Sequence, residues 1–116
     1  MLNNITFAPS INSTLTKTMT KTRGEKDLED FELVFKALAH ESRRTILSIL
    51  QARGGTLNAG DIVQDFSYAW PTMTRHLQQL EEAGLITVDK ISREQHYTLN
   101  KERLTVTVNK WLKWFN

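Results

Sequence analysis

The sequence has no cysteine among its 116 residues, which excludes disulfides, thiolate metal sites and thiol-based redox sensing. It also has no apolar run long enough to span a membrane, and its first residues lack the apolar core of a secretory signal. We therefore expect no membrane partner, and a cytoplasmic protein is the default prediction.

Segments 1–24 and 67–80 are among those that contain no acidic residue, although the chain carries 13 of them. Residues 67–80 hold one basic side chain, Arg75, whereas residues 25–32 hold five acids and Lys26. The net charge of +2 and the pI of about 9.0 are only mildly basic, so this distribution is more informative than the total. It predicts one end that tolerates a polyanion and another that repels it.

The combinations of residues that enzymes use are also missing. The sequence shows no nucleophile–base pair, no glycine-rich phosphate loop and no paired carboxylates in a plausible cleft. His40, His76 and His96 fall on three different expected elements without ligand spacing, so we predict no metal site and no cofactor. The sequence therefore predicts a protein that is not an enzyme.

The first 24 residues differ in composition from the remainder. They contain six Thr, two Ser and three Asn, and their only charges are Lys17, Lys21 and Arg23. Low hydrophobicity and the lack of a helical period predict a flexible, basic, Thr-rich arm over residues 1–24, with one folded domain over residues 25–116. The arm could track phosphates or reach a minor groove, or it could be an unselected tail.

Apolar periodicity predicts helices through the first half of the domain. The first should run from Asp27 to about Ala39, and the second from Glu41 to the glycines at 54–55. Asn58 is a good N-cap for a short third helix. The second half should contain a hairpin over residues 85–90 and 94–100, which Thr56 and Leu57 could extend, and a last helix with an apolar stripe.

Residues 71–83 are the most informative segment. At 100° per residue, Met73, Leu77 and Leu80 fall on one side of a helix that Gly84 ends. The other side carries no acid before residue 81, and its side chains are Thr72, Arg75, Gln78 and Gln79. Guanidinium, amide and hydroxyl groups suit the base edges and phosphates of a DNA major groove. The alternative is an ordinary surface helix of a small domain.

Five segments, in this order, resemble the ArsR-type bacterial repressors, a family of dimeric winged helix-turn-helix transcription factors. They are residues 36–47 (KALAHESRRTIL), 59–62 (AGDI), 74–80 (TRHLQQL), 83–86 (AGLI) and 97–99 (YTL). The resemblance spans residues 28–115. It implies a mainly α fold with a small β-hairpin (α+β), with about five helices and a two- to three-stranded wing.

The chain departs from the family pattern in three places. The family usually has Ser or Thr just before the recognition helix, whereas this chain has Ala69-Trp70, so that start must depend on Pro71 and on packing of Trp70. Ser92 stands where the wing usually has Gly, so the turn there could be of another type. The cysteine, acid and histidine ligands of metal-sensing members are absent, which indicates a non-metal-sensing branch.

The resemblance assigns candidate residues to two surfaces. The expected DNA-binding residues are Thr72, Thr74, Arg75, His76, Gln78 and Gln79 on the recognition helix, with Lys90 and Arg93 on the wing. His76 lies at the edge of the apolar side, so it is either packed or bonded to a phosphate. The expected dimer interface comprises Phe31, Phe35, Leu104, Val108, Trp111 and Phe115. For Arg43 and Arg44 we expect one structural salt bridge and one possible phosphate contact.

The leading hypothesis is a sequence-specific DNA-binding transcriptional regulator. We expect a homodimeric repressor that binds double-stranded DNA at an inverted repeat; the sequence leaves open constitutive action and control by an unknown effector or protein partner. The alternative is a winged-helix protein-interaction module with no DNA-binding role.

Overall fold

The computed structural model describes residues 22–66 and 68–116. In chain order the elements are α2 (Arg23–Leu38), α3 (Glu41–Ala52), β1 (Thr56–Asn58), α4 (Ala59–Gln64), α5 (Trp70–Glu82), β2 (Ile86–Ile91), β3 (Glu94–Leu99), α6 (Lys101–Leu112) and the 3-10 turn η1 (Lys113–Phe115). Five α-helices and a three-stranded sheet in this part of the chain confirm the expected winged helix-turn-helix, a mainly α fold with a small β-hairpin.

Helix α2 begins at Arg23, four residues before the expected start at Asp27. Thr22 and Glu25 form a reciprocal capping box: the Glu25 amide donates to Thr22 Oγ1 at 3.2 Å, and the Thr22 amide donates to Glu25 Oε1 at 2.9 Å. Arg23 and Gly24, assigned to the arm from the sequence, are therefore helical. The rest of the expected arm, residues 1–21, lies outside the described residues.

Side-chain caps start the next two helices. The Asp61 amide donates to Asn58 Oδ1 at 2.8 Å, which confirms Asn58 as the N-cap of α4. His40 caps α3 in the same manner, since its Nδ1 accepts from the Ser42 amide at 3.1 Å. Sequence reasoning missed this role because histidine is not among the usual N-cap residues.

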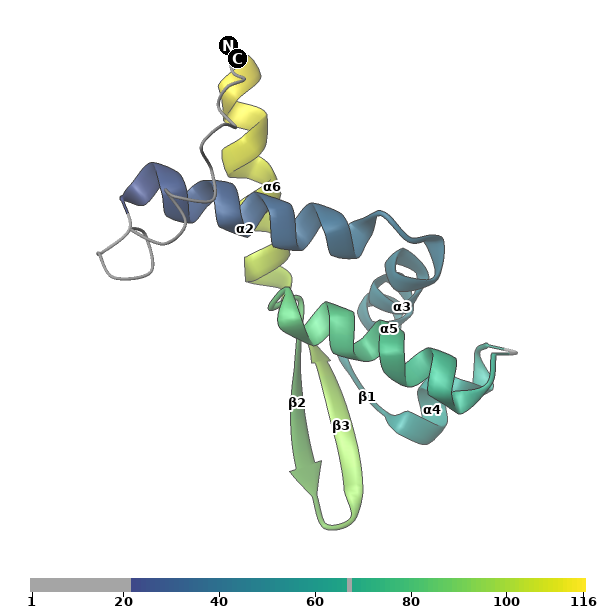
Figure 1. Cartoon of the computed structure of the whole chain (residues 1–116). Coiled ribbons are helices and arrows are strands. Elements are labelled where there is room, and N and C mark those ends of the chain that lie inside the picture. Colours follow the sequence, from purple (N-terminus) through teal and green to yellow (C-terminus); the bar gives the residue numbers. More distant parts are fainter. Residues whose placement is uncertain (1–21, 67) are drawn as a thin grey trace, which may run out of the picture.

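The sheet has the strand order β1–β3–β2, and both pairings are antiparallel. Thr56 lies opposite Thr98, so the expected pairing of residues 56–57 with the hairpin is confirmed. Strands β2 and β3 extend beyond the helices as a two-stranded wing (Figure 1). Their inner ends join the core, since Ile86 and Tyr97 are buried, whereas the residues near the tip are exposed.

A single core lies between α3, α5 and the inner ends of the strands. Helices α2 and α4 also contribute to it, and its largest fully buried side chains are Val34, Ile46, Leu50, Ile62, Met73, Leu80, Leu85 and Ile86. Helix α6 crosses α2 and projects away from the core on the side opposite the wing (Figure 1). Among the described residues, no helix combines the length and apolar character needed to cross a membrane.

Candidate nucleic-acid interface

Helix α5 presents two chemically different faces. Met73, Leu77 and Leu80 are buried in the core as the helical period predicts. On the opposite side Thr72, Arg75 and Gln78 are exposed, while Thr74 and Gln79 are half-buried. The exposed face carries hydrogen-bonding groups and one guanidinium, and it has no carboxylate until Glu81.

The start of α5 has no side-chain cap, as expected from Ala69. Pro71 occupies one of the first two helical positions, where a missing N–H costs nothing, and the Ala69 carbonyl accepts from the amides of Thr72 and Met73. The expected packing of Trp70 is only partial, because the residue remains 40% exposed. This partly exposed indole lies at the first turn of α5, and sequence reasoning did not include it in the site.

His76 differs from the other seven candidate DNA-binding residues because it is buried, at 8% exposed. Its ring lies 4.5 Å from that of His40, between centroids, and its Nδ1 lies 3.4 Å from Arg43 Nη1. Burial lowers the pKa of His76, and the charges of His40, Arg43 and Arg75 lower it further. Of the two alternatives for His76, the free protein shows the packed one. The neutral ring lies on the buried side of α5.

Arg43 and Arg44 both cap the C-terminus of α2. Arg43 Nε donates to the Ala37 carbonyl at 2.7 Å and Arg43 Nη2 to the Lys36 carbonyl at 3.2 Å, while Arg44 Nη1 donates to the Leu38 carbonyl at 2.8 Å. The expected salt bridge is therefore wrong. The cations instead bind carbonyls of the last turn of α2, at the negative end of its dipole.

Arg103 holds the other end of α5. Its Nε donates to the Ala83 carbonyl at 3.0 Å, and its Nη1 lies 3.1 Å from Asp30 Oδ1 on α2. Burial alone would raise the pKa of Asp30, but hydrogen bonds and charges from Arg103 and Lys26 outweigh it and lower that pKa. The recognition helix thus contacts α2 through arginine side chains at two separate points.

The wing turn contains two residues, Ser92 and Arg93, between the paired Ile91 and Glu94. Ser92 has φ of 59°, the left-handed conformation that glycine usually supplies there, and Arg93 does not share it. A positive φ at the first central residue alone is the pattern of a type II′ turn. The turn leaves Lys90 and Arg93 exposed, and both line a hollow of about 400 Å³ beside the start of α4.

A second surface is apolar and lies where α2 crosses α6. We call it the aromatic surface, and it consists of Leu28, Phe31, Phe35, Trp111, Trp114 and Phe115 around a hollow of about 730 Å³, whose lining the exposed Glu32 completes. The Trp111 ring contacts Phe35 at 5.0 Å and Phe115 at 4.9 Å, between centroids. Trp114 is 78% exposed and Phe115 is 70% exposed.

The six residues expected at the dimer interface divide into two groups. Phe35, Trp111 and Phe115 lie on the aromatic surface with exposed or half-buried rings, and the buried Phe31 lies beneath them. Leu104 and Val108 are half-buried and pack against the core of their own protomer. The exposed Leu28 was missed because it does not continue the aromatic pattern. Trp114 was expected in the aromatic patch of the last helix, although it falls off the i, i+4, i+7 stripe and was not listed among the interface residues.

In residues 22–66 and 68–116, no three metal-ligating side chains of His, Cys, Asp or Glu lie close enough together to hold an ion. The expectation of no metal response remains a prediction for binding experiments.

Comparison with known proteins places these surfaces in context. Residues 38–89 match the family model for a helix-turn-helix domain. The chain is 35% identical to the transcriptional repressor SdpR of Bacillus subtilis over 72% of its length and 90% of that protein. It is 32% identical to an arsenical resistance operon repressor of Staphylococcus xylosus, covering 66% of this chain and 71% of that one. A solved ArsR-like transcriptional regulator from Rhodococcus sp. RHA1 is 25% identical, with a TM-score of 0.65 over 74% of this chain and 79% of that chain.

Proposed function

The chain belongs to the ArsR family of winged helix-turn-helix transcriptional regulators, and we propose that it is a homodimeric repressor that binds an inverted repeat in double-stranded DNA. The observation that carries this proposal is the exposed face of α5, which is free of acids from Trp70 to Leu80 and lies in one protomer with a wing tip that exposes Lys90 and Arg93. Regulation, and not catalysis, is the activity of the relatives by name.

Base reading is assigned to the centre of the exposed face. Arg75 suits the O6 and N7 acceptors of guanine, and the Gln78 and Gln79 amides suit adenine. Thr72 and Thr74 are assigned to phosphates, and Trp70 to apolar contact at the edge of the groove, such as a thymine methyl. His76 is assigned to packing and not to DNA contact, since its ring is buried and lies beside Arg43.

The wing supplies charge. Lys90 and Arg93 are exposed on the part of the hairpin that extends beyond the helices, where a long cation can enter a minor groove or contact its phosphates. The minor groove offers a degenerate pattern of donors and acceptors, so these two residues are assigned to affinity more than to sequence preference.

The aromatic surface is assigned to the two-fold interface. Two tryptophans and two phenylalanines on one protomer form more apolar area than a monomer of this size usually exposes. A second copy seated there would bury these rings and bring two recognition helices to the two halves of an inverted repeat. Two further proposals follow from the partner and the composition. Because the proposed partner is DNA, we propose a cytoplasmic location. Because the chain has no cysteine, we propose that a signal other than a metal controls it.

The proposal is tested by separating base reading from phosphate contact. Genomic fragments selected by the protein would supply an operator, and each variant is then titrated with salt on this operator and on a scrambled duplex. Arg75→Ala should lose about 1–3 kcal/mol on the operator and much less on the scrambled duplex. Arg93→Ala should weaken both similarly and lower the salt slope by about one per protomer.

Lys113→Ala, which removes an exposed cation on η1 far from the wing, is the matched control and should leave both affinities unchanged. Failure to select any fragment at about 50 mM salt, where phosphate contacts are strong, would favour the protein-interaction alternative.

A further inference from the structure

A groove between α3 and α6 belongs to neither of the surfaces described above. It has a volume of about 410 Å³, within the range of small-molecule sites, and lies against the base of the wing. Its lining comes from α3, β3 and α6: Leu47, Ser48, Gln51, Ala52, Leu99, Lys101, Leu104 and Thr105. None of these residues belongs to the DNA-binding face.

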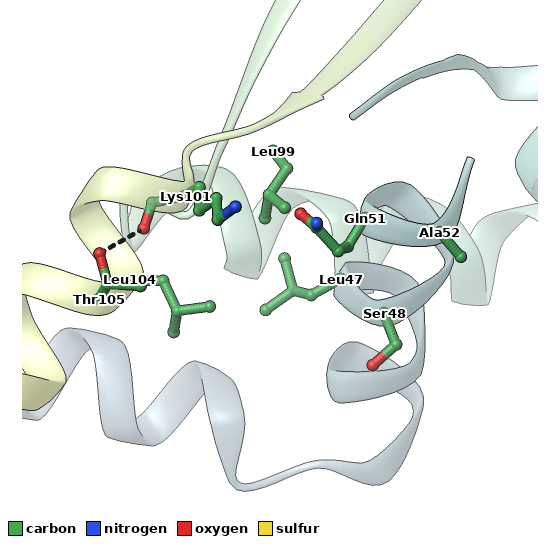
Figure 2. A pocket seen from close by; sticks show the side chains of 8 residues that line it. All are labelled: Leu47, Ser48, Gln51, Ala52, Leu99, Lys101, Leu104 and Thr105. Carbon is green, nitrogen blue, oxygen red and sulfur yellow. Dashed lines mark hydrogen bonds between the residues drawn. The ribbon is translucent and has the colours of Figure 1, made fainter. Parts of the chain in front are cut away.

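The groove is chemically divided along its length. Figure 2 shows Leu47 and Leu104 pointing toward each other across its apolar part, while Lys101 and Gln51 extend their polar ends toward the region beside Leu99. Apolar walls with a few convergent polar groups are typical of sites that bind small molecules with one polar end.

The polar end favours an anion. Lys101 is the one charged residue in the lining, and it is also the first residue of α6, where the helix dipole adds positive potential. The two hydroxyls of the lining already donate to backbone carbonyls, Ser48 to Arg44 and Thr105 to Lys101. The Lys101 ammonium and the Gln51 amide are then the donors offered to a ligand.

We propose that this groove binds a small monocarboxylate with an apolar tail, the carboxylate accepting from Lys101 and Gln51 and the tail lying between Leu47 and Leu104. Helix α3 packs against the recognition helix α5, and α6 carries part of the aromatic surface. A molecule held between α3 and α6 therefore contacts the supports of both functional surfaces and can act as an effector. Binding itself does not depend on the proposed function, whereas the effector role rests on it.

The test uses the full chain and three probes: decanoate, decanol with the same tail and no charge, and acetate with no tail. Decanoate should bind with micromolar affinity and shift the methyl resonances of Leu47, Leu99 and Leu104. Decanol should bind at least tenfold more weakly, and acetate should not bind at millimolar concentration.

Two variants and a control separate the head group from the tail. Lys101→Met should weaken decanoate at least tenfold and leave decanol unchanged, while Thr105→Phe, which fills the groove, should abolish both. Lys113→Met, a second exposed lysine of the same terminal segment, should change neither.

The proposal is overturned if decanoate and decanol bind equally, or if the shifts fall on Leu28 and Leu33 at the exposed part of α2, since both results would show non-specific contact with apolar surface. It is also overturned if the methyls shift only in a monomeric variant, because the partner protomer would then cover the groove. Normal decanoate binding with no change in operator affinity would leave the site standing and remove only its effector role.

Discussion

Replacing Arg43 by alanine should destabilise the protein far more than replacing its neighbour Arg44. Arg43 makes two charge-assisted bonds to the end of α2, at 2.7 Å to the Ala37 carbonyl in a partly buried position and at 3.2 Å to the exposed Lys36 carbonyl. Arg44 makes one such bond, at 2.8 Å and exposed. Both lie in the first turn of α3, so differences in helix propensity nearly cancel.

The magnitudes follow from these bonds. A partly buried bond from a charged donor is worth about 1.5–3 kcal/mol, and an exposed one about 0.5–1 kcal/mol. Arg43→Ala should therefore cost about 2–4 kcal/mol, since the 3.4 Å contact with His76 adds little, and Arg44→Ala about 0.5–1 kcal/mol. With a urea m-value of about 1.5 kcal/mol/M, the midpoints should fall by roughly 2 M and 0.5 M.

Urea unfolding followed by circular dichroism gives both midpoints, at one fixed protein concentration because a dimer's stability depends on it. Arg43→Lys is a useful third variant, since it keeps the charge but cannot reach two carbonyls as a fork. Equal midpoint losses for Arg43→Ala and Arg44→Ala would refute the assignment of Arg43 as the principal cap of α2.

Three further predictions concern the interface, the buried histidine and the wing. The double variant Trp111→Ala, Phe115→Ala should sediment as a monomer. Val106→Ala, at an exposed position elsewhere on α6, should remain a dimer. A double variant that stays dimeric would disprove the interface. Burial and nearby cations lower the pKa of His76 in the folded state, so the unfolded chain binds the proton more readily. The free energy of unfolding should therefore be highest above pH 6.5 and fall below it. In urea titrations across pH, His76→Gln should reduce this loss, and an unchanged loss would assign the pH dependence to other groups. Ser92→Gly should stabilise the protein by about 0.5 kcal/mol in thermal melts, because relief of the strain at a positive φ exceeds the added entropy of the unfolded chain. A loss of stability would show that Ser92 makes a favourable contact in the turn.

Local rules predicted the parts of this fold that depend on neighbouring residues. The buried side of α5 follows from the spacing of Met73, Leu77 and Leu80, and the start of α4 follows from Asn58. The early start of α2 was also within reach of such a rule. Thr22 and Glu25 have the spacing of a capping box, but the apolar period begins later and misplaced the boundary.

Contacts between distant elements could not be predicted in the same way. One arginine of the pair 43–44 was expected to form a salt bridge. The sequence placed the end of the first helix near Ala39, but it did not show that these side chains turn back to the carbonyls of Ala37 and Leu38. Trp70 was expected to pack because no side chain could cap the start of the recognition helix, yet 40% of its surface stays exposed. Its exposure is information that only the packed structure supplies.

The long-range contacts matter most for the spacing of two recognition helices. Arg103 connects Asp30 of α2 to the carbonyl of Ala83, the C-cap of α5, and Arg43, which binds the end of α2, adds a weaker 3.4 Å contact with His76 of α5. Lys110 adds a third link, at 3.2 Å to Asp27, which fixes α6 on α2. Because the aromatic surface lies on α2 and α6, any partner seated there is held in a fixed relation to α5. In the proposed dimer, these arginines would set the distance between recognition helices, which must match about one DNA turn, and their loss should reduce operator affinity even in a protein that remains folded.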